Sequence, residues 1–537
     1  MTTELRKSRT VPSSPFPVID LFAGPGGLSE GFASLRTARG RPSFEVRLSV
    51  EKDSVAHQTL ELRSFVRAFQ PGPPDAYYDF LSGDMDRNAL FTDRRFRDQA
   101  ERAKSEAWHC TLSEETHEPV SRRVKKAIGQ SGAWVLIGGP PCQAYSLMGR
   151  SRMRSSNPKR FDKDERHFLY REYLRIIADH APPVFVMENV KGILSSTVQG
   201  GLIFNHILSD LSRPNGGALR YRVIPLAHSQ DLFRDNPGGY IVRCEQYGIP
   251  QARHRVILCG IREDLTGDPL GLIQQDDRAG IEEALEGLPP IRSRLSKEDD
   301  SHHAWIGALR EASQSLTEGS YEDVRSTMTS HLARAQKLFT TGEPYASYLP
   351  VRGRRGAAAE NLQKWYRDPR LTVVTGHESR SHMRSDLQRY FFAASFALAR
   401  DNVSPTLRDF PRFLLPQHRN ARRKSTETPF ADRFRVQVYG RPSTTIASHI
   451  AKDGHYYIHP DPAQCRSLTL REAARLQTFP DNYHFEGNRT QQYHQVGNAV
   501  PPLLARQIAA SIGTYLGRDR MAALRDRPIG EARHASI

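Results

Sequence analysis

At the centre of the sequence stands Trp134-Val135-Leu136-Ile137-Gly138-Gly139-Pro140-Pro141-Cys142-Gln143. The apolar run at its start predicts a buried parallel strand. Two glycines then allow a sharp turn, and two prolines stiffen the chain after it. Ligands of open α/β sheets bind beyond the carboxyl ends of the strands, so Cys142 is a candidate nucleophile. The alternative is that Cys142 is a small buried apolar residue, as most free cysteines are.

An earlier stretch, 18–32, predicts a strand, a glycine-rich turn and a helix. The turn contains Gly24, Gly26 and Gly27, and it would present backbone N–H groups and a helix N-terminus to a ligand. Its spacing is not G-x-G-x-x-G, so the dinucleotide fingerprint is absent. A tight turn without a ligand is the alternative.

Two acidic residues follow predicted elements. Residues 44–51 alternate apolar and polar side chains, which indicates a second strand that ends in Glu51, where nucleotide-binding sheets hold ribose hydroxyls. A third element spans 77–81, and Asp84 beyond it is a candidate acceptor for an adenine amino group. The alternatives are a surface glutamate and an ordinary turn aspartate.

A carboxylate also stands at the end of the apolar run 183–190, which predicts another buried strand. Sequential strands tend to be neighbours, so Glu188 should lie close to Cys142. A buried carboxylate is costly unless it has a partner or a task. We therefore predict that Glu188 is catalytic.

The chain is strongly basic, with 76 Lys and Arg against 60 Asp and Glu and a net charge of +16. Such an excess indicates a polyanionic partner, most often nucleic acid. The loop 149–160 carries five basic residues and no acid. We predict that Arg150, Arg152 and Arg154 contact nucleic-acid phosphates, although a solvated surface would have the same composition.

A second group of donors lies near the end of the first sheet region. Gln251, Arg253 and Arg255 alternate, so on a strand they would face one side, between predicted strands at 220–226 and 256–261. Three donors on one face suit a base edge or a phosphate. A solvated strand face is the alternative.

The pattern then predicts an inserted domain. Residues 263–465 lack strand–helix alternation and include helical patterns at 304–316 and 385–399 and a strand-like stretch at 434–439. Thr469 and Glu472 form a capping box that starts a helix in the closing segment. A Gly497-Asn498 turn then precedes a helix at 503–515. We predict a sheet domain built from 1–262 and 466–537, with 263–465 as the insert.

Five cysteines are scattered and form no C-x-x-C pair, so neither a metal site nor a disulfide framework is predicted. This cysteine usage fits a reducing cytoplasm. The first seventeen residues lack the apolar core of a signal peptide, and no apolar run is long enough to span a membrane. We therefore expect a cytoplasmic protein without a membrane partner.

Taken in order, these motifs resemble the DNA (cytosine-5) methyltransferase family. The matching pieces are 20–27, 139–143, 188–190, 251–255, 466–480 and 495–501. The resemblance implies a Rossmann-like α/β sheet domain that binds S-adenosylmethionine, with a smaller inserted target-recognition domain. One departure is Ala144-Tyr145-Ser146, where the family usually has Gly-Phe-Ser.

The resemblance also implies residue roles. Cys142 would attack carbon 6 of a flipped-out cytosine, Glu188 would protonate or hold N3, and Arg255 would hold the pyrimidine oxygen with help from Arg253. The implied cofactor residues are Phe22, Gly24, Gly26, Gly27, Glu51, Asp84, Pro140, Asn498 and Val500. The implied DNA contacts are Arg150, Arg152, Arg154 and Gln251.

The implied partner is double-stranded DNA, and a cognate restriction endonuclease could accompany a monomeric enzyme. Two alternatives stay open: an RNA cytosine-5 methyltransferase of the same architecture and a non-catalytic DNA-binding regulator. The tRNA-acting subgroup carries a Cys-Phe-Thr tripeptide that this sequence lacks, and a regulator would not need Cys142, Glu188 and Arg255 together. Adenine-N6 or cytosine-N4 methylation would need an Asp/Asn/Ser-Pro-Pro-aromatic tetrapeptide, whereas this sequence has Gly139-Pro140-Pro141-Cys142.

Overall fold

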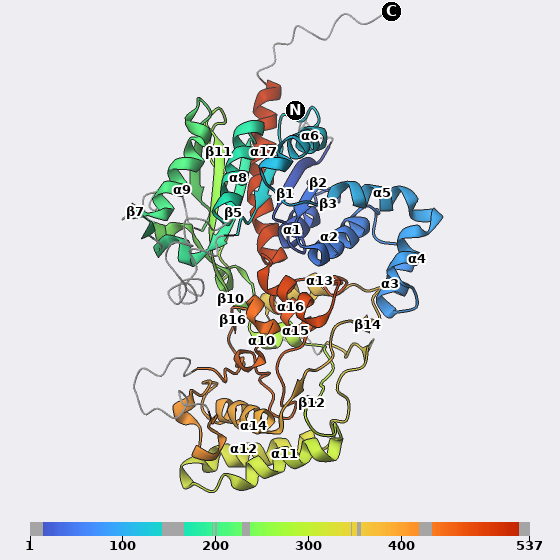
Figure 1. The fold of residues 1–537 in the computed structure, drawn as a ribbon, viewed down its shortest axis with the longest axis vertical. Coiled ribbons are helices and arrows are strands. Elements are labelled where there is room, and N and C mark those ends of the chain that lie inside the picture. The colour runs from blue at the N-terminus through green and yellow to red at the C-terminus, as the bar shows by residue number, and fades with distance from the viewer. Residues whose placement is uncertain are drawn as a thin grey trace, which may run out of the picture.

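A computed structural model describes residues 14–141, 166–195, 197–198, 201–227, 237–344, 346–351, 356–417 and 432–525 of the 537-residue chain. Figure 1 shows a larger part built around a sheet and a lower lobe of helices and loops. The helices α10, α13, α15 and α16 lie where the two parts meet. Among the described helices, none combines the length and the apolar character that crossing a bilayer requires.

The main sheet has the strand order β3-β2-β1-β4-β5-β11-β8, and β9 pairs with β11. The pairs from β3 to β5 are parallel, whereas β11 is antiparallel to β5 and β8. The strands are β1 (Phe16–Leu21), β2 (Phe44–Glu51), β3 (Ala107–His109), β4 (Val135–Gly138), β5 (Val184–Val190), β8 (Tyr221–Pro225), β9 (Ile241–Arg243) and β11 (His254–Arg262). The predicted α/β sheet domain is confirmed, including the strands at 18–22, 44–51, 134–138, 183–190, 220–226 and 256–261.

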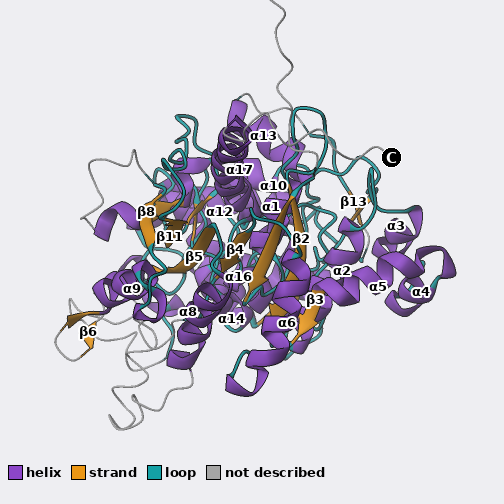
Figure 2. Ribbon diagram, turned by 90° about the horizontal axis from the view of Figure 1, so that it is seen from above, coloured by secondary structure: helices purple, strands orange, loops and turns teal. Residues whose placement is uncertain are grey.

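Helices cover both faces of this sheet because its strands are apolar on both sides. In β1, Val18 belongs to the core beneath α1 and α17, whereas Ile19 and Leu21 belong to the core on the other face, beneath α6, α8 and α9. Figure 2 shows the two helix layers with the strands between them. These helices are α1 (Gly27–Ser34), α6 (His117–Ile128), α8 (Arg166–His180), α9 (Ile203–Ser212) and α17 (Pro502–Arg525).

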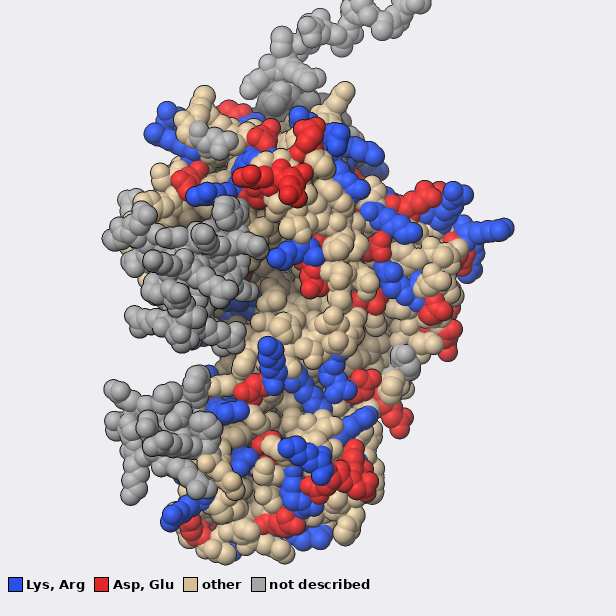
Figure 3. Space-filling model, in the orientation of Figure 1, with Lys and Arg blue, Asp and Glu red and all other residues tan. Residues whose placement is uncertain are grey.

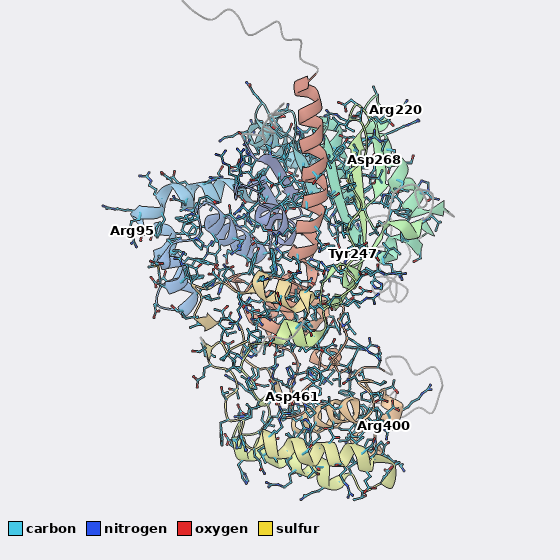
Figure 4. The ribbon with its side chains drawn as sticks, turned by 180° about the vertical axis from the view of Figure 1, so that it is seen from behind. Arg95, Arg220, Tyr247, Asp268, Arg400 and Asp461 are labelled. Atoms are coloured by element: carbon cyan, nitrogen blue, oxygen red, sulfur yellow. The ribbon has the colours of Figure 1, made fainter. Side chains whose placement is uncertain are left out.

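The last helix, α17, completes the sheet domain by packing against the first. A Cβ atom on Gly31 of α1 would lie 2.4 Å from the Ala505 Cβ of α17, so only glycine permits this approach. Figure 4 shows α17 running along the domain, with Tyr247 near its lower part. The backbone carbonyl of Tyr247 accepts a hydrogen bond from the Gln507 side chain of α17 at 2.8 Å.

The region 75–128 differs from the prediction. The element expected at 77–81 is a helix, α3, and the strand that extends the sheet is the three-residue β3. In Figure 4 the labelled Arg95 stands at the outer tip of the projection that α3, α4 and α5 form. The helices of this side are α2 (Ser54–Arg67), α3 (Asp75–Ser82), α4 (Arg87–Thr92) and α5 (Arg97–Glu106).

The lower lobe has its own apolar core. It forms around α11 (His302–Ser315), α12 (Glu322–Ala335) and α14 (Arg384–Ala399), with the fully buried Trp305 as its largest side chain. Both predicted helices, at 304–316 and 385–399, are therefore confirmed. The strand expected at 434–439 is wrong, since only Val436 makes an isolated bridge there, to Ile458. Arg400 and Asp461 mark this lobe in Figure 4.

Short elements join the lobe to the sheet domain. The helices α10 (Ile281–Leu285) and α13 (Ala357–Tyr366) share an apolar core with α15 and α16 of the closing segment. The boundaries 263 and 465 of the inserted domain stay a prediction. The remaining two-residue strands are β6 (Thr197–Val198), β7 (Gly201–Leu202), β10 (Gln251–Ala252), β12 (Arg294–Leu295), β13 (Ala346–Ser347), β14 (Val373–Val374), β15 (Ser381–His382) and β16 (Ser443–Thr444).

The closing segment begins as predicted and then differs in one place. Helix α15 (Leu470–Leu476) starts at a capping box in which the Thr469 N–H donates to the Glu472 carboxylate at 2.7 Å. The pair Gly497-Asn498 does not form a free turn, because it ends helix α16 (Arg489–Asn498). Asn498 is therefore held by a helix rather than by a loop.

Candidate active site

A cavity of about 700 Å³ lies at the carboxyl ends of the parallel strands. Its walls come mainly from the turns after β1, β2, β3 and β4, from the last residues of β5, from β11 and the residue before it, from residues 447–448, and from α16 with the two residues after it. Ten of the residues predicted from the sequence line it: Phe22, Gly24, Gly27, Glu51, Pro140, Glu188, Arg253, Arg255, Asn498 and Val500. The sheet therefore brings together seven of the nine predicted cofactor residues and three of the four predicted catalytic residues.

The glycine turn is tied to the end of β2 through Glu51. One oxygen of its carboxylate accepts a hydrogen bond from the Gly24 N–H at 2.8 Å, and the other accepts one from the Asp53 N–H at 2.7 Å. Phe22 and Gly24 both have φ of 57°, a left-handed conformation that a phenylalanine rarely adopts. Such strained positions cluster at ligand sites, because the surrounding structure must hold them.

Behind the turn, Asp20 is completely buried near the end of β1. The Ser29 hydroxyl of α1 donates a hydrogen bond to one of its oxygens, and the other oxygen has no hydrogen-bond partner among the described residues. Burial raises the pKa of Asp20 from 3.8 to about 7. This carboxyl therefore supports the turn from below and does not line the cavity.

At the other side of the cavity, Glu188 and Arg255 form an ion pair. The Arg255 Nε lies 2.9 Å from a Glu188 carboxylate oxygen, and both side chains are only slightly exposed. A Cβ on Gly139 would lie 3.0 Å from the other Glu188 oxygen, so the glycine makes room for this carboxylate beside β4. A carboxylate and a guanidinium thus share one wall, directly beside the Gly-Pro-Pro turn.

The turn itself carries the predicted nucleophile. Pro141, which precedes Cys142 in the sequence, lines the cavity, and its neighbour Pro140 accepts a hydrogen bond from the Asn189 amide at 3.3 Å. Cys142 lies outside the described residues, as do Arg150, Arg152 and Arg154. The closeness of Cys142 to Glu188 and the DNA contacts of the three arginines therefore stay predictions.

Arg253 is a buried side chain at the edge of the cavity that hydrogen-bonds to backbone carbonyls of two other segments. Its guanidinium donates hydrogen bonds to the backbone carbonyls of Ile446, Gly497 and Ala499, at 2.9, 3.3 and 2.9 Å. Burial, together with the nearby Arg255, lowers the pKa of Arg253 to about 9. Because two of these bonds go to Gly497 and Ala499, Arg253 fixes the segment that carries Asn498.

Three predicted residues do not line the cavity. Gln251 is fully buried, and its side chain bonds the Leu476 carbonyl, the Gln477 side chain and the Ile446 N–H, so the prediction that it contacts DNA is wrong. Asp84 is exposed at the end of α3, where the Ser82 hydroxyl donates to it, and it does not line the cavity, so its adenine contact stays a prediction. Gly26 shapes the turn from behind, since a Cβ there would lie 2.9 Å from a Leu60 methyl carbon.

Sequence reasoning missed other parts of the wall. Cys110 and Leu112 follow β3 and line the cavity next to Glu51, in the place expected for Asp84. His494 and Gln491 of α16 line it from the opposite side. A strand of three residues leaves almost no periodic signal, so β3 was hidden in a charged helical region. Among the described residues, no three His, Cys, Asp or Glu side chains are grouped so as to hold a metal ion.

Comparison with known proteins places this arrangement in context. A family model described as C-5 cytosine-specific DNA methylase matches residues 109–514. The type II methyltransferase M.Bpa9945I of Bacillus paralicheniformis is 30% identical over 515 residues, which cover 92% of this chain and 98% of that protein. The DNA (cytosine-5-)-methyltransferase M.ApeKI of Aeropyrum pernix is 28% identical over 72% of this chain and 83% of its own length.

A solved structure has a similar fold. It is described as a DNA modification methyltransferase encoded within an E. coli prophage, and it superposes with a TM-score of 0.50 and 20% sequence identity. The superposition covers 93% of this chain and 99% of that one. At this identity the likeness concerns the fold alone, and it agrees with a Rossmann-like sheet domain carrying an additional lobe.

Proposed function

Because the chain belongs to the C-5 cytosine-specific DNA methylase family and is a DNA (cytosine-5-)-methyltransferase, we propose that it methylates carbon 5 of a cytosine turned out of duplex DNA. The methyl donor in this proposal is S-adenosylmethionine. One observation supports it above all others: the Glu51-held glycine turn and the Glu188–Arg255 ion pair line the same cavity. A donor site and a base site would thus share one enclosed space.

The residues of the cavity suit S-adenosylmethionine. A volume of about 700 Å³ lies within the usual range of cofactor pockets. The Glu51 carboxylate uses one hydrogen bond on each oxygen and keeps acceptor capacity for ribose hydroxyls. Phe22, Leu112 and Val500 offer apolar surface for an adenine ring. When bound, the cofactor would supply an electrophilic methyl group.

The chain's own residues would make the cytosine reactive. Carbon 5 of cytosine is a poor nucleophile, and addition of the Cys142 thiolate at carbon 6 turns the ring into an enamine. In this step Glu188, which must first take up a proton from water as the base enters, gives that proton to N3. Carbon 5 then takes the methyl group. Loss of the carbon 5 proton to a base and release of the thiolate restore the aromatic ring. Arg255, already paired with Glu188, would hold the pyrimidine oxygen.

Duplex DNA is the proposed substrate, and a restriction–modification system the proposed setting. The relative M.Bpa9945I is named a type II methyltransferase. A base inside a stacked duplex cannot reach an enclosed cavity, so the target would have to be flipped out, at a cost of about a few kcal/mol. The basic residues 150, 152 and 154 would hold the opened strand. We further propose that the enzyme acts as a monomer.

Methyl transfer from labelled S-adenosylmethionine tests the proposal. The protein is incubated with duplex DNA or with transfer RNA, and the modified base is identified by mass spectrometry. We expect 5-methylcytosine in DNA only, and none with Cys142→Ser. Label found in RNA alone, or in neither substrate, would refute the proposed reaction.

A trapping experiment tests the covalent step separately. In 5-fluorocytosine, a fluorine on carbon 5 replaces the proton whose loss releases the thiolate. Duplex DNA with this base at the target should therefore stay covalently bound to Cys142, and the adduct should persist on a denaturing gel. The variant Cys142→Ser should bind the same DNA and form no adduct. Cys244→Ser is the matched control, because Cys244 is a buried thiol of the sheet core and should leave the adduct unchanged.

A further inference from the structure

A second cavity, of about 450 Å³, opens beside the opposite end of β2 from Glu51. The β2 residues 45–48 form its floor, and α5 and α6 form its walls. Strand β3 pairs only with the β2 residues Ser49, Val50 and Glu51. Within the described ranges, the outer edge of β2 at 45–48 is therefore not covered by another strand, and the two helices enclose a hollow there.

A β-bulge turns Arg47 into this hollow. The pairing of β1 with β2 steps from Val18 opposite Val46 to Ile19 opposite Leu48, which leaves Arg47 without a partner on β1. Bulges redirect a side chain in this way. The Arg47 guanidinium donates to Glu45 at 2.9 Å and to the Ala127 carbonyl, near the end of α6, at 3.2 Å.

The charges that line the cavity are mainly positive. Its four cationic side chains are Arg47, Arg102, Arg123 and Lys126, and its two carboxylates are Glu45 and Glu106. Glu45 is paired with both Arg47 and Arg102, and Glu106 is paired with Arg67, which does not line the cavity. Arg123 and Lys126 make no ion pair with any described residue. Two cationic side chains of the lining thus lack an ion-pair partner, and the lining as a whole has four cations against two carboxylates.

Arg123 is held in position as a hydrogen-bond donor. Its guanidinium lies over the Trp108 ring, 4.4 Å from the ring centroid, a contact that fixes the plane of the group. Its Nη1 is buried and donates no hydrogen bond to a described residue. Because this atom is buried, it is not the donor that a ligand in the cavity would meet, but the side chain as a whole is half-buried, and a planar guanidinium matches the spacing of phosphate oxygens.

We propose that this cavity binds a phosphate monoester. A phosphate monoester carries a charge of about −1.5 to −2 at neutral pH, which matches the two cations that lack an ion-pair partner. The volume leaves room for an organic group beyond the phosphate itself. No residue lines both this cavity and the proposed active site, so the two sites are separate. The phosphate belongs either to a free mononucleotide or to the 5′ end of a DNA strand.

Calorimetric titration of the full chain tests the proposal with inorganic phosphate and with 5′-dAMP, at constant ionic strength. Saturable binding is expected, and Arg123→Gln should weaken it about tenfold or more, as expected for loss of a charged hydrogen bond. The matched control is Arg122→Gln, the neighbour on α6, whose side chain is 70% exposed and paired with Glu118. That variant should retain the wild-type affinity.

Two further measurements close the test. Lys126→Gln alters an exposed lysine and should also weaken binding. It provides a second test of the site in case the Arg123 variant does not fold. Competition with a duplex that carries a 5′ phosphate, against one without it, separates the two sources. Equal affinity in the wild type, the Arg123 variant and the Lys126 variant, or no saturable binding at millimolar phosphate, would overturn the proposal.

Discussion

At the scale of single residues, Glu188 is the side chain on which the proposed chemistry depends most directly. The variant Glu188→Gln keeps the shape of the side chain but cannot give a proton to N3, and it leaves Arg255 without a charged partner. We expect the rate of methyl transfer to fall by about 10²–10⁴-fold. Single-turnover measurements with saturating cofactor check this.

The same experiment needs a measure of intact binding. Cofactor affinity of Glu188→Gln should stay within about twofold of the wild type, because Glu51 and the glycine turn are unchanged. Glu118→Gln, at a side chain that is 76% exposed on α6, is the control for a carboxylate-to-amide change. A Glu188 variant with wild-type single-turnover rates would remove this residue from the mechanism.

Asp20 gives a prediction about pH. Its pKa is raised from 3.8 to about 7 by burial, so the folded protein retains a proton that the unfolded chain releases between these values. The contribution of this group to stability is complete below about pH 4 and is lost as the pH rises to about 7. Asp20→Asn has no charge to bury, so its stability should not decrease in this way as the pH rises.

Urea unfolding at several pH values measures the effect. The stability of Asp20→Asn relative to the wild type should rise by about 2 kcal/mol between pH 5.5 and pH 7, since each pH unit of the window corresponds to about 1.4 kcal/mol. Parallel stability curves for the two proteins would mean that Asp20 is ionised in the folded state throughout.

The residues that sequence reasoning placed correctly share a simple property. Glu51 and Glu188 each end an apolar strand, and the ends of parallel strands meet at one edge of the sheet, so their position follows from the local pattern. Gln251 was misplaced for the opposite reason. Alternation indicated that it shares a face with Arg255, but the residues that bury it, Leu476 and Gln477, are more than two hundred positions away in the chain.

At the scale of elements, the packing of α1 on α17 depends on glycine. In Gly31→Ala the new methyl group would lie 2.4 Å from the Ala505 Cβ and 2.5 Å from the Pro502 carbonyl oxygen. Relief of this overlap requires the two helices to separate, and we expect a loss of about 1–3 kcal/mol in stability. The midpoint of thermal unfolding measures it.

Gly307 of α11 provides the matched control, because we expect its substitution by alanine to increase stability. A Cβ there would come no closer than 3.8 Å to any neighbouring group, the Arg384 guanidinium. Alanine restricts the unfolded chain and favours a helix, so Gly307→Ala should stabilise the protein by about 0.5–1 kcal/mol. Equal effects of the two substitutions would show that helix propensity, not the α1–α17 contact, decides the outcome at Gly31.

Element length explains which parts of the fold were foreseen. The long apolar strands β1, β2 and β5 and the long helices α11 and α14 carry clear periodic patterns. The three residues of β3 do not, and as a result Cys110 and Leu112, which follow β3 and line the cavity, were not foreseen.

At the scale of the whole molecule, buried arginines join the closing segment to residues 284–286, before the lower lobe, and to Thr375, between α13 and α14. Arg475 of α15 is completely buried, forms a two-pronged ion pair with Asp481 and donates to the backbone carbonyls of Ala284 and Glu286. Arg471, one turn earlier, donates hydrogen bonds to the backbone carbonyl and the side-chain hydroxyl of Thr375. In Figure 3 blue side chains also lie on the surface along this junction.

Removing one partner of the buried pair should therefore weaken the whole assembly. Asp481→Asn leaves the Arg475 charge buried without a counter-ion, and we expect a loss of about 3–5 kcal/mol. Asp75→Asn is the control, because Asp75 pairs with Arg370 at the surface with its side chain 95% exposed, and its loss should cost less than about 1 kcal/mol. Chemical denaturation of both variants measures the difference, and equal losses would contradict the proposed role of the junction.

The contact between α1 and α17 has a consequence for biosynthesis. A ribosome releases α1 early, but the helix that covers its glycine-lined face emerges only after the lower lobe has been translated. Until then the nascent chain must carry an unfinished sheet domain, and premature termination before residue 502 would yield a polypeptide whose α1 lacks its cover.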